Sequence, residues 1–277
     1  MFRRSICAGF GGTTAAVGWV IASCDAGDAA WDENWDHREP TEKRPYRSKV
    51  TRHIILLRHG QYDETQTERS GERKLTALGR RQAELTGDRL RAMVDALGDS
   101  GRLRSIIVSD LTRAKETAAI VHERLGDIAV PVGAPDPNLN EGKPAVPVPS
   151  KRGADYYAAR VYKDGARIEA AFRSYVKRAQ PTKKEPITDI DNAEGAVGSP
   201  VRHEFDIIVC HGNVIRFFVM RALQLPPQAW LRLCFFNCSL TCLSVRPNGR
   251  VSLRYAGDVG HLSEANVTYG SHEGWAW

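Results

Sequence analysis

The chain has 277 residues, a formal net charge of +6, 42% hydrophobic residues and 26% charged residues. These values are typical of a globular protein with one large core and appendages, and they exclude a chain that is disordered throughout. The mild basic excess suits phosphorylated substrates or acidic membrane surfaces, whereas the lack of a Lys and Arg block interleaved with aromatic residues argues against nucleic-acid binding.

Residues 5–24, SICAGFGGTTAAVGWVIASC, form a stretch of twenty uncharged residues after the two arginines of MFRR. Twenty residues are just enough to cross a bilayer as a helix. We expect a membrane anchor within residues 1–24, and two alternatives stay open: a cleaved signal peptide and a bacterial lipoprotein signal that ends in IASC. In such a helix, Ala8, Gly12 and Ala16 would form a face of small residues that allows close helix packing.

Residues 25–50 are polar and charged and contain two prolines, a composition typical of an extended linker. Within this segment, the motif WDENWD places Trp31 and Trp35 four residues apart beside three acidic residues. Two indoles left in water would be unusual in a linker. Two predictions therefore compete: the motif packs on the folded domain of its own chain, or it docks on a neighbouring subunit.

The stretch HIILLRHGQY (53–62) begins as a buried strand and ends in Arg58, His59 and Gly60. Four consecutive apolar residues indicate a strand covered on both faces, as in an α/β sheet, and such sheets bind ligands at the carboxyl ends of their strands. A guanidinium and an imidazole buried together also require compensation. We therefore expect an anionic ligand at this strand end.

Further strand-to-helix junctions follow along the chain. Thr76 is a candidate cap for a helix within residues 74–94, and the apolar run LRSIIVSD (103–110) leads into a helix that has Arg113 near its start. A third strand, FDIIVC (205–210), ends at His211 and precedes a helix over 213–225. A hairpin with the turn PNG follows, whereas residues 143–150 and 181–203 are expected to be loops.

These junctions would bring two arginines, two histidines and helix amino termini to one pocket, which is the composition of a receptor for a tetrahedral dianion such as phosphate. A histidine beside arginines is favoured as neutral imidazole, whose free ring nitrogen can attack phosphorus. The leaving oxygen then needs a proton from a carboxylic acid. Glu141 in NLNEGKP is the first candidate for this acid, and Asp110 is the second.

The six cysteines contain no C-x-x-C pair, so we expect reduced, buried thiols and no disulfide framework. Cys234, Cys238 and Cys242 recur every four residues, which would place three metal ligands on one face of a helix. Because FNCSLTCLSV is rich in strand-forming residues, we expect no metal site there.

Four elements resemble, in chain order, the histidine phosphatase superfamily: RHG at 58–60, SDLTRAKET around Arg113, NLNEG around Glu141, and the late CHGN. The resemblance implies an α/β, phosphoglycerate mutase-like fold, with three α/β/α layers, a central mainly parallel sheet and helices on both faces. It covers nearly the whole chain, because WDENWD, TRHIILLRHGQY, DGARIEAAFRSY, HGNVIRFFVMRALQLPP and RPNGRVSLR are similar to the mitochondrial, membrane-anchored serine/threonine phosphatases of this superfamily.

The resemblance implies a role for each matching residue. His59 matches the nucleophile that becomes phosphorylated, His211 the histidine that supports the transferring phosphoryl group, and Glu141 the general acid and base. The catalytic set is Arg58, His59, Arg113, Glu141 and His211, and the phosphate-binding set is Arg58, His59, Arg113, His211, Gly212 and Asn213. No metal or organic cofactor is implied.

The resemblance further implies that WDENWD drives assembly into dimers and larger rings that activate the enzyme, through Trp31, Asp32, Asn34, Trp35 and Asp36. It also implies a mitochondrial membrane, outer or inner, as the location, with residues 5–24 as a single anchor. The expected organisation is a membrane segment over 1–24, a linker with the WDENWD motif over 25–50, and a catalytic domain over 51–277.

The leading prediction is a phosphatase that acts on phosphoserine and phosphothreonine in proteins through a phosphohistidine intermediate. A phosphatase with the same chemistry on a small metabolite, such as a sugar phosphate, is one alternative, and a membrane-anchored adaptor with weak catalysis is another. The intact set of His59, Arg113, Glu141 and His211 favours an active enzyme, since such groups act as a unit. Mutase activity is not expected, because the residues after NLNEG lack the arginine and tyrosine-glycine pattern of phosphoglycerate mutases.

Overall fold

The structure is a computed structural model that describes residues 31–41, 48–65, 73–150, 154–180 and 202–269. The chain divides into two units, Met1–Trp31 and Asp32–Trp277. The anchor expected over residues 1–24 lies outside the described residues. Among the helices that the structure does describe, none has the length and apolar character needed to span a membrane.

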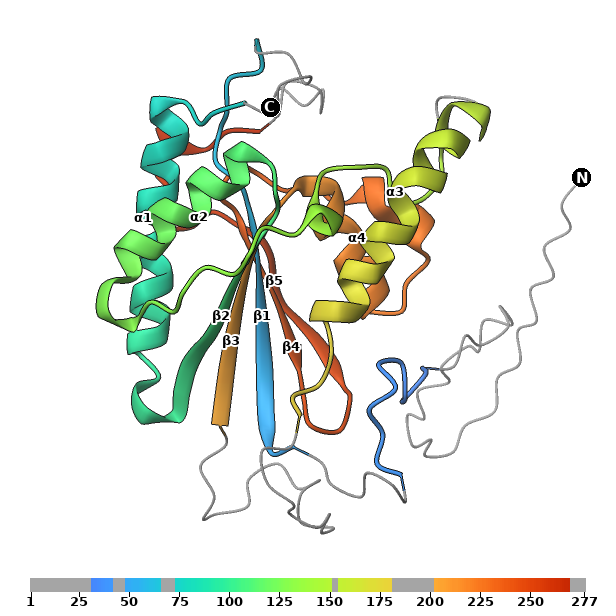
Figure 1. Ribbon diagram of the computed structural model, residues 1–277, viewed down its shortest axis with the longest axis horizontal. Coiled ribbons are helices and arrows are strands. Elements are labelled where there is room, and N and C mark those ends of the chain that lie inside the picture. Colours follow the sequence, from blue (N-terminus) through green and yellow to red (C-terminus); the bar gives the residue numbers. More distant parts are fainter. Residues whose placement is uncertain (1–30, 42–47, 66–72, 151–153, 181–201, 270–277) are drawn as a thin grey trace, which may run out of the picture. The chain divides into compact units, whose positions relative to one another are not determined.

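A five-stranded sheet with the order β2-β3-β1-β4-β5 forms the centre of the larger unit (Figure 1). Its strands are β1 (Val50–Arg58), β2 (Gly101–Val108), β3 (Arg202–Cys210), β4 (Leu240–Val245) and β5 (Val251–Asp258). β1, β2 and β3 are parallel, whereas β4 pairs antiparallel with both β1 and β5. Only β4 thus runs against the other strands of this sheet, which is mainly parallel as predicted.

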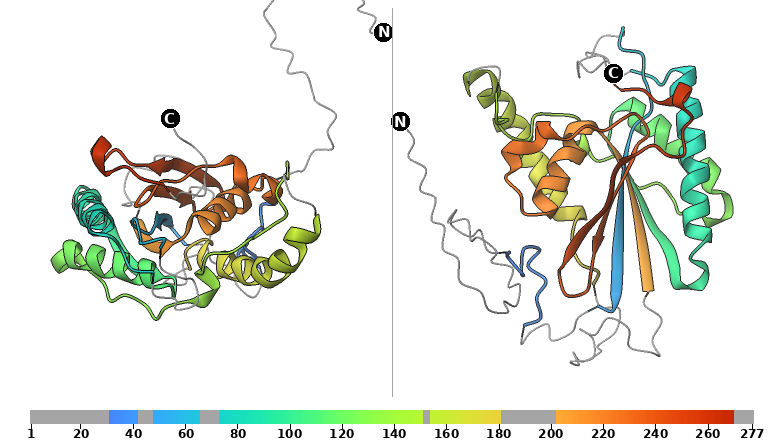
Figure 2. Two further views of the ribbon diagram at one scale, coloured as in Figure 1. Left: turned by 90° about the horizontal axis from the view of Figure 1, so that it is seen from above. Right: turned by 180° about the vertical axis from the view of Figure 1, so that it is seen from behind.

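Four helices cover the two faces of the sheet (Figures 1 and 2): α1 (Ala77–Asp95), α2 (Thr112–Leu125), α3 (Ala154–Tyr175) and α4 (Gly212–Ala222). Alternate side chains of β1 point to opposite faces, so Ile55 and Leu57 pack with α1 and α2, whereas Ile54 and Leu56 pack with α3 and α4. The predicted three-layer α/β/α architecture is confirmed.

Short 3-10 helices occupy several connections: η2 (Gly98–Ser100), η3 (Gly126–Ile128), η4 (Pro137–Leu139), η6 (Pro227–Arg232) and η7 (Glu264–Asn266). Thr76 caps α1 as predicted, since its side chain accepts a hydrogen bond from the Gly79 amide. The hairpin between β4 and β5 turns at Gly249, whose φ of 87° favours glycine.

Two segments differ from expectation. Residues 202 and 203 were expected in a loop but belong to β3, because they pair with Val50 and Thr51 of β1 in a parallel register. Helix α3 was not predicted as a helix from its residue pattern. Its buried residues, Ile168, Ala171 and Phe172, pack in the same hydrophobic cluster as α4.

The predicted linker is partly folded, because residues 32–36 of WDENWD belong to the larger unit and form hydrogen bonds within it. The Trp35 indole Nε1 donates to the Gly249 carbonyl at 2.8 Å, and the Asp36 carboxylate accepts from the backbone N–H of Arg178 at 2.8 Å. Asp32 and Gln224 exchange two hydrogen bonds of 2.8 and 3.0 Å. Within this single chain the motif packs on its own domain, which is the first of the two competing predictions.

Candidate active site

The predicted site residues gather at the carboxyl ends of the three adjacent parallel strands. Arg58 and His59 lie at the end of β1, and His211 follows β3 directly. The rings of His59 and His211 have centroids 5.0 Å apart, and the Arg113 Nε atom at the start of α2 lies 3.2 Å from His59 Nε2. Chain segments separated by more than 150 positions therefore supply one cluster.

The backbone around His59 is held on several sides. The His59 amide donates to the Cys210 carbonyl at 3.0 Å, which continues the pairing of β1 with β3. The Gly60 amide donates to the Thr117 hydroxyl of α2 at 3.0 Å, and the Asn237 side chain donates to the His59 carbonyl at 3.2 Å. These bonds fix the position from which the imidazole projects.

The hydrogen bonds of His59 define its tautomer. Nδ1 lies 2.8 Å from the Gly60 carbonyl oxygen, and because a carbonyl can only accept, Nδ1 carries the proton. Nε2 therefore has a lone pair, which accepts the hydrogen bond from Arg113 Nε. Burial, with the charges of Arg113 and Arg58, holds the pKa of His59 well below its usual value, so the ring is neutral.

His211 is fully buried and hydrogen bonded on one side only. Its Nε2 lies 2.7 Å from the Ser109 hydroxyl, which donates its own proton to Asn140 Oδ1 at 2.8 Å. Nε2 of His211 is therefore the donor to Ser109, while Nδ1 has no hydrogen-bond partner among the described residues. An unpaired buried nitrogen beside His59 is what a site built for a further ligand would contain.

Glu141 lies near enough to Arg113 and Arg58 for their charges to act on it, whereas Asp110 is exposed and paired with Lys115 at 3.2 Å. Burial raises the pKa of Glu141, although the charges of Arg113, Arg58 and Arg216 act in the opposite direction. A raised pKa favours the protonated form that a general acid requires.

The site also contains two helix amino termini. Leu111 and His211 are the N-cap residues of α2 and α4, and neither forms a side-chain capping hydrogen bond. Helix amino termini favour the binding of anions. Gly212 lies against Arg58, because a Cβ at this glycine would be 3.7 Å from Arg58 Nε. The Arg58 guanidinium itself donates to the Phe235 carbonyl.

The Asn213 side chain, which was predicted to bind phosphate, is hydrogen bonded to other residues of the chain. Its Nδ2 donates to the Gly142 carbonyl at 3.0 Å, and its Oδ1 accepts from Arg216 at 2.9 Å. Asn213 therefore contacts the loop that carries Glu141, and any contact with phosphate would use its backbone.

Two residues of the cluster were missed by sequence reasoning. Ser109 is fully buried and links His211 to Asn140; its position at the end of β2, matching that of His59 at the end of β1, is a signal that could have identified it. The Tyr62 ring lies edge-on to His59 at 5.3 Å, with the Arg113 guanidinium 4.8 Å above its centroid. Tyr62 thus covers one side of the nucleophile candidate.

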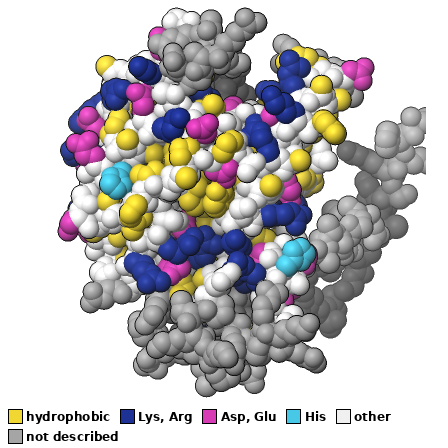
Figure 3. All heavy atoms as spheres, in the orientation of Figure 1, with side chains coloured by type: hydrophobic (Ala, Val, Ile, Leu, Met, Phe, Trp, Pro, Cys, Tyr) yellow, Lys and Arg dark blue, Asp and Glu magenta, His cyan; other side chains and the backbone are white. Residues whose placement is uncertain are grey.

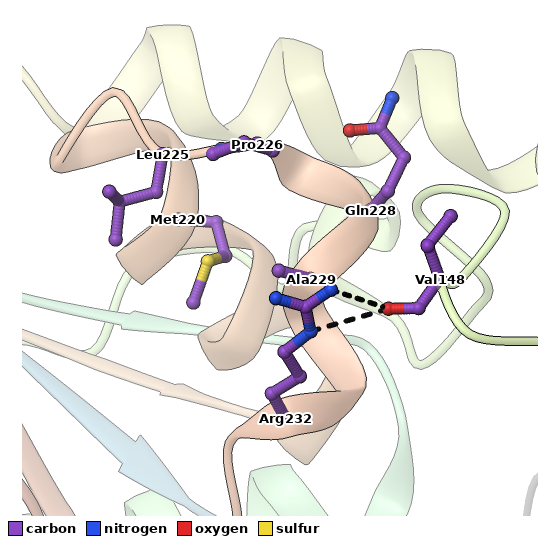
Figure 4. A pocket seen from close by; sticks show the side chains of 7 residues that line it. All are labelled: Val148, Met220, Leu225, Pro226, Gln228, Ala229 and Arg232. Atoms are coloured by element: carbon purple, nitrogen blue, oxygen red, sulfur yellow. Dashed lines mark hydrogen bonds between the residues drawn. The ribbon is translucent and has the colours of Figure 1, made fainter. Parts of the chain in front are cut away.

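A cavity of about 590 Å³ lies elsewhere, at the junction of α4 and η6 (Figure 4). It is lined by Val148, Met220, Leu225, Pro226, Gln228, Ala229 and Arg232. Arg232 donates to the Val148 carbonyl at 3.0 and 3.3 Å. Because none of these side chains is a nucleophile or a carboxylic acid, this cavity is not the place for the chemistry predicted above.

The structure describes four of the six cysteines. Cys210, Cys234, Cys238 and Cys242 are free thiols, and burial raises the pKa of Cys238 to about 12 and that of Cys242 to about 11. Only Cys242 of the three regularly spaced cysteines lies in a strand, β4. Across the described ranges, no group of three or more His, Cys, Asp or Glu side chains could hold a metal ion.

Known proteins are similar to this chain in sequence. The model of the family described as "Histidine phosphatase superfamily (branch 1)" matches residues 54–144 and 199–257. The mitochondrial serine/threonine-protein phosphatase PGAM5 of Rattus norvegicus is 38% identical over 275 residues, covering 92% of this chain and 85% of the rat protein. The Homo sapiens protein of the same name is 39% identical over 261 residues, covering 87% of this chain and 81% of its own length.

Among solved structures, a phosphoglycerate mutase from Plasmodium falciparum is 31% identical, covers 82% of this chain and 99% of that chain, and superposes with a TM-score of 0.46. The two segments matched by the family model contain the RHG sequence, Arg113, Glu141 and the late histidine. The chain belongs to the histidine phosphatase superfamily.

Proposed function

We propose that the chain is a protein phosphatase that hydrolyses phosphoserine and phosphothreonine through a phosphohistidine on His59. The observation that carries the proposal is the tautomer of His59, with its proton held on Nδ1 by the Gly60 carbonyl and its lone pair on Nε2. In the first step, Nε2 attacks phosphorus and the bond to the ester oxygen breaks. The ester oxygen takes the proton of the Glu141 carboxyl group and leaves as an alcohol.

In the second step, water attacks the phosphohistidine. The water proton passes to the Glu141 carboxylate, the N–P bond breaks with its electron pair returning to Nε2, and phosphate leaves. Arg58 and Arg113 neutralise the charge of the phosphoryl oxygens in both steps. Nδ1 of His211 has no hydrogen-bond partner among the described residues, and a protonated phosphoryl oxygen of the substrate could donate to it.

The names of the relatives support a protein substrate, because the rat and human proteins are called serine/threonine-protein phosphatases. The fold and the His59 chemistry would serve a small phosphorylated metabolite equally well. The choice between these substrate classes therefore rests on the relatives at 38 and 39% identity.

Assembly and location are parts of the proposal. The contacts of Trp35 with Gly249 and of Asp36 with Arg178 define a docking site for WDENWD, and a neighbouring subunit's motif can occupy an identical site by exchange. We propose that this exchange builds rings and activates the enzyme. The relatives are named mitochondrial, which supports a mitochondrial membrane location with residues 5–24 as the anchor.

The test uses the full chain and its His59→Ala variant, assayed on a phosphothreonine peptide and on a phosphorylated three-carbon acid. We expect peptide hydrolysis that disappears in the variant, together with a phosphoryl group on the protein that is labile in acid and stable in base. Turnover of the small acid alone would instead support the metabolite enzyme. A phosphoenzyme that persists in His59→Ala would rule out the proposed nucleophile.

Assembly is tested with Trp35→Ala, measured by light scattering and by the same peptide assay. We expect smaller particles and weaker peptide hydrolysis. Full activity from a monomeric variant would contradict activation by assembly.

A further inference from the structure

We propose that Arg167, with Asp164 as its partner, is a positioning residue that holds the loop bearing Glu141 in its working place. Both residues lie on α3, one turn apart. Neither forms a hydrogen bond with His59 or His211, although the charge of Arg167 helps to lower the pKa of His211. The proposal rests on the proposed function, because it assumes that Glu141 is the general acid.

The Arg167 guanidinium donates to successive backbone carbonyls of this loop. Nη1 donates to the Asn140 carbonyl at 2.5 Å and to the Asn138 carbonyl at 3.2 Å, and Nη2 donates to the carbonyl of Glu141 itself at 2.8 Å. The planar fork of a guanidinium suits such multiple contacts, and a Lys ammonium cannot reproduce them.

Asp164 completes the contact from the other side. Its Oδ1 accepts from Arg167 Nη2 at 2.8 Å, and its Oδ2 accepts from the Lys143 amide at 2.9 Å. The loop approaches so closely that a Cβ at Gly142 would lie 2.4 Å from Arg167 Nη2 and 2.6 Å from Asp164 Cγ. Only glycine fits at this position without moving the pair.

Asn213 at the start of α4 holds the same loop through the Gly142 carbonyl at 3.0 Å. The backbone from Asn140 to Lys143 is thus tied to two helices. Helix α3 is itself anchored in the core, because its residues Ile168 and Phe172, which follow Arg167, are buried there.

The Glu141 carboxyl group depends on this backbone. Its Oε1 accepts a hydrogen bond from the amide of the next residue, Gly142, at 3.1 Å. The backbone of the loop therefore helps to determine where the carboxyl group points. A displacement of about 1 Å can reduce a rate about 10²-fold, since proton transfer requires hydrogen-bond distance to the leaving oxygen. Arg167 would therefore influence the protonation step through the backbone of the Glu141 loop.

The decisive measurement compares two leaving groups. An alkoxide leaving from phosphothreonine needs the proton of Glu141, whereas the nitrophenolate of p-nitrophenyl phosphate leaves without one. Arg167→Gln in the full chain should lower kcat/KM, which reports only the steps up to departure of the leaving group, about 10²-fold on a phosphothreonine peptide and about threefold or less on p-nitrophenyl phosphate. A purely structural role would lower both rates by the same factor, through the loss of folded enzyme.

Three further variants complete the experiment. Glu141→Gln should give the same selectivity with a larger loss, and Arg167→Lys should recover only part of the peptide activity. Arg173→Gln is the matched control, because Arg173 lies on the same helix in an exposed pair with Glu169 at 2.9 Å and should behave as the wild type. If Arg167→Gln does not fold, Gly142→Ala tests the same contact.

The outcomes separate the two proposals. Equal losses on both substrates, or no loss, in Arg167→Gln or Gly142→Ala would overturn the positioning role if Glu141→Gln remains selective for the peptide. A Glu141→Gln variant without selectivity would overturn the acid role of Glu141 in the proposed function, and the positioning inference with it.

Discussion

Strand β1 carries a buried arginine near each end, and the two arginines have different surroundings. Arg52 near the amino end is 4% exposed, and Arg58 at the carboxyl end is 6% exposed. Arg52 Nε donates to the Asp206 carboxylate at 3.0 Å, and its Nη1 donates to the Lys177 carbonyl at 2.7 Å. Arg58 instead lies among Arg113 and two histidines whose pKa values its charge helps to lower.

Further ion pairs lie near the amino ends of the neighbouring strands β2 and β3. Arg102 and Arg104 form ion pairs with Glu204 and Asp206 of β3. In Figure 3, Lys and Arg side chains form a band across the lower half of the face shown, interspersed with acidic side chains. A carboxylate compensates the buried charge of Arg52, whereas the charges of Arg58 and Arg113 act on two neutral histidines, as the proposed phosphate site requires.

The strongest test of this comparison is Arg58→Gln. We expect kcat/KM on a phosphothreonine peptide to fall by about 10³-fold or more, because a cation at the phosphoryl group is lost. The free energy of unfolding should change by less than about 1 kcal/mol, since removing the Arg58 charge relieves its repulsion with nearby Arg113. Peptide kinetics and urea unfolding of the same sample measure both quantities. A large loss of stability with little loss of activity would contradict the comparison.

Asp206→Asn is the converse test at the amino end. It should lower the free energy of unfolding by about 3–5 kcal/mol, because Arg52 would remain buried without its carboxylate. The kcat/KM of the folded fraction should stay within about twofold of the wild type, as the change lies at the opposite end of the strands. Urea unfolding gives the first value, and kinetics corrected for the folded fraction give the second. Retained stability would mean that the pair contributes little.

The carboxyl end should also control the pH dependence of activity. His59 must be neutral, and since its pKa lies well below its usual value, the acidic limb of kcat/KM should lie below pH 6.5. Glu141 must be protonated in the first step, and its pKa is raised above the usual 4.5, so peptide hydrolysis should fall on the alkaline side as Glu141 ionises. With p-nitrophenyl phosphate this alkaline limb should be absent. An alkaline limb of equal depth on both substrates would exclude Glu141 as its cause.

The smallest expected effect concerns His53, near the amino end of β1, and the dependence of the free energy of unfolding on pH. Burial, with the charges of His203 and Arg254, lowers the pKa of His53 to about 4, and His53 contacts Ser244 at 2.8 Å and His203 at 2.9 Å. The unfolded chain takes up a proton near pH 6.5 but the folded chain only near pH 4, so stability is lost as the pH falls between these values. Thermal unfolding from pH 7.5 to 5 should show this loss, and His53→Gln should reduce it.

The local sequence pattern was sufficient to predict the three parallel strands. The apolar runs before Arg58, Asp110 and His211 predicted three buried strands, and the polar residues after them predicted one shared edge, because parallel strands align their carboxyl ends. The structure has β1, β2 and β3 at these places and brings the five predicted catalytic residues into one region. Their catalytic roles stay predictions.

Other features have no local signal. Asn213 and Arg167 meet the Glu141 loop only because α4 and α3 pack beside it, and their partners are backbone carbonyls, which every residue possesses. The contact of Trp35 with Gly249 joins positions 214 residues apart, so the sequence left its partner open.

By itself, the sequence determined the strand cores, the order of the elements and the residue types of an anion site, because burial and strand-end chemistry appear as local patterns. The tertiary structure alone decided the tautomer of His59, the unpaired nitrogen of His211, the loop held by Arg167 and the contrast between Arg52 and Arg58. These properties depend on which carbonyl, hydroxyl or carboxylate lies within hydrogen-bond distance, and that distance is set by packing between segments far apart in the chain.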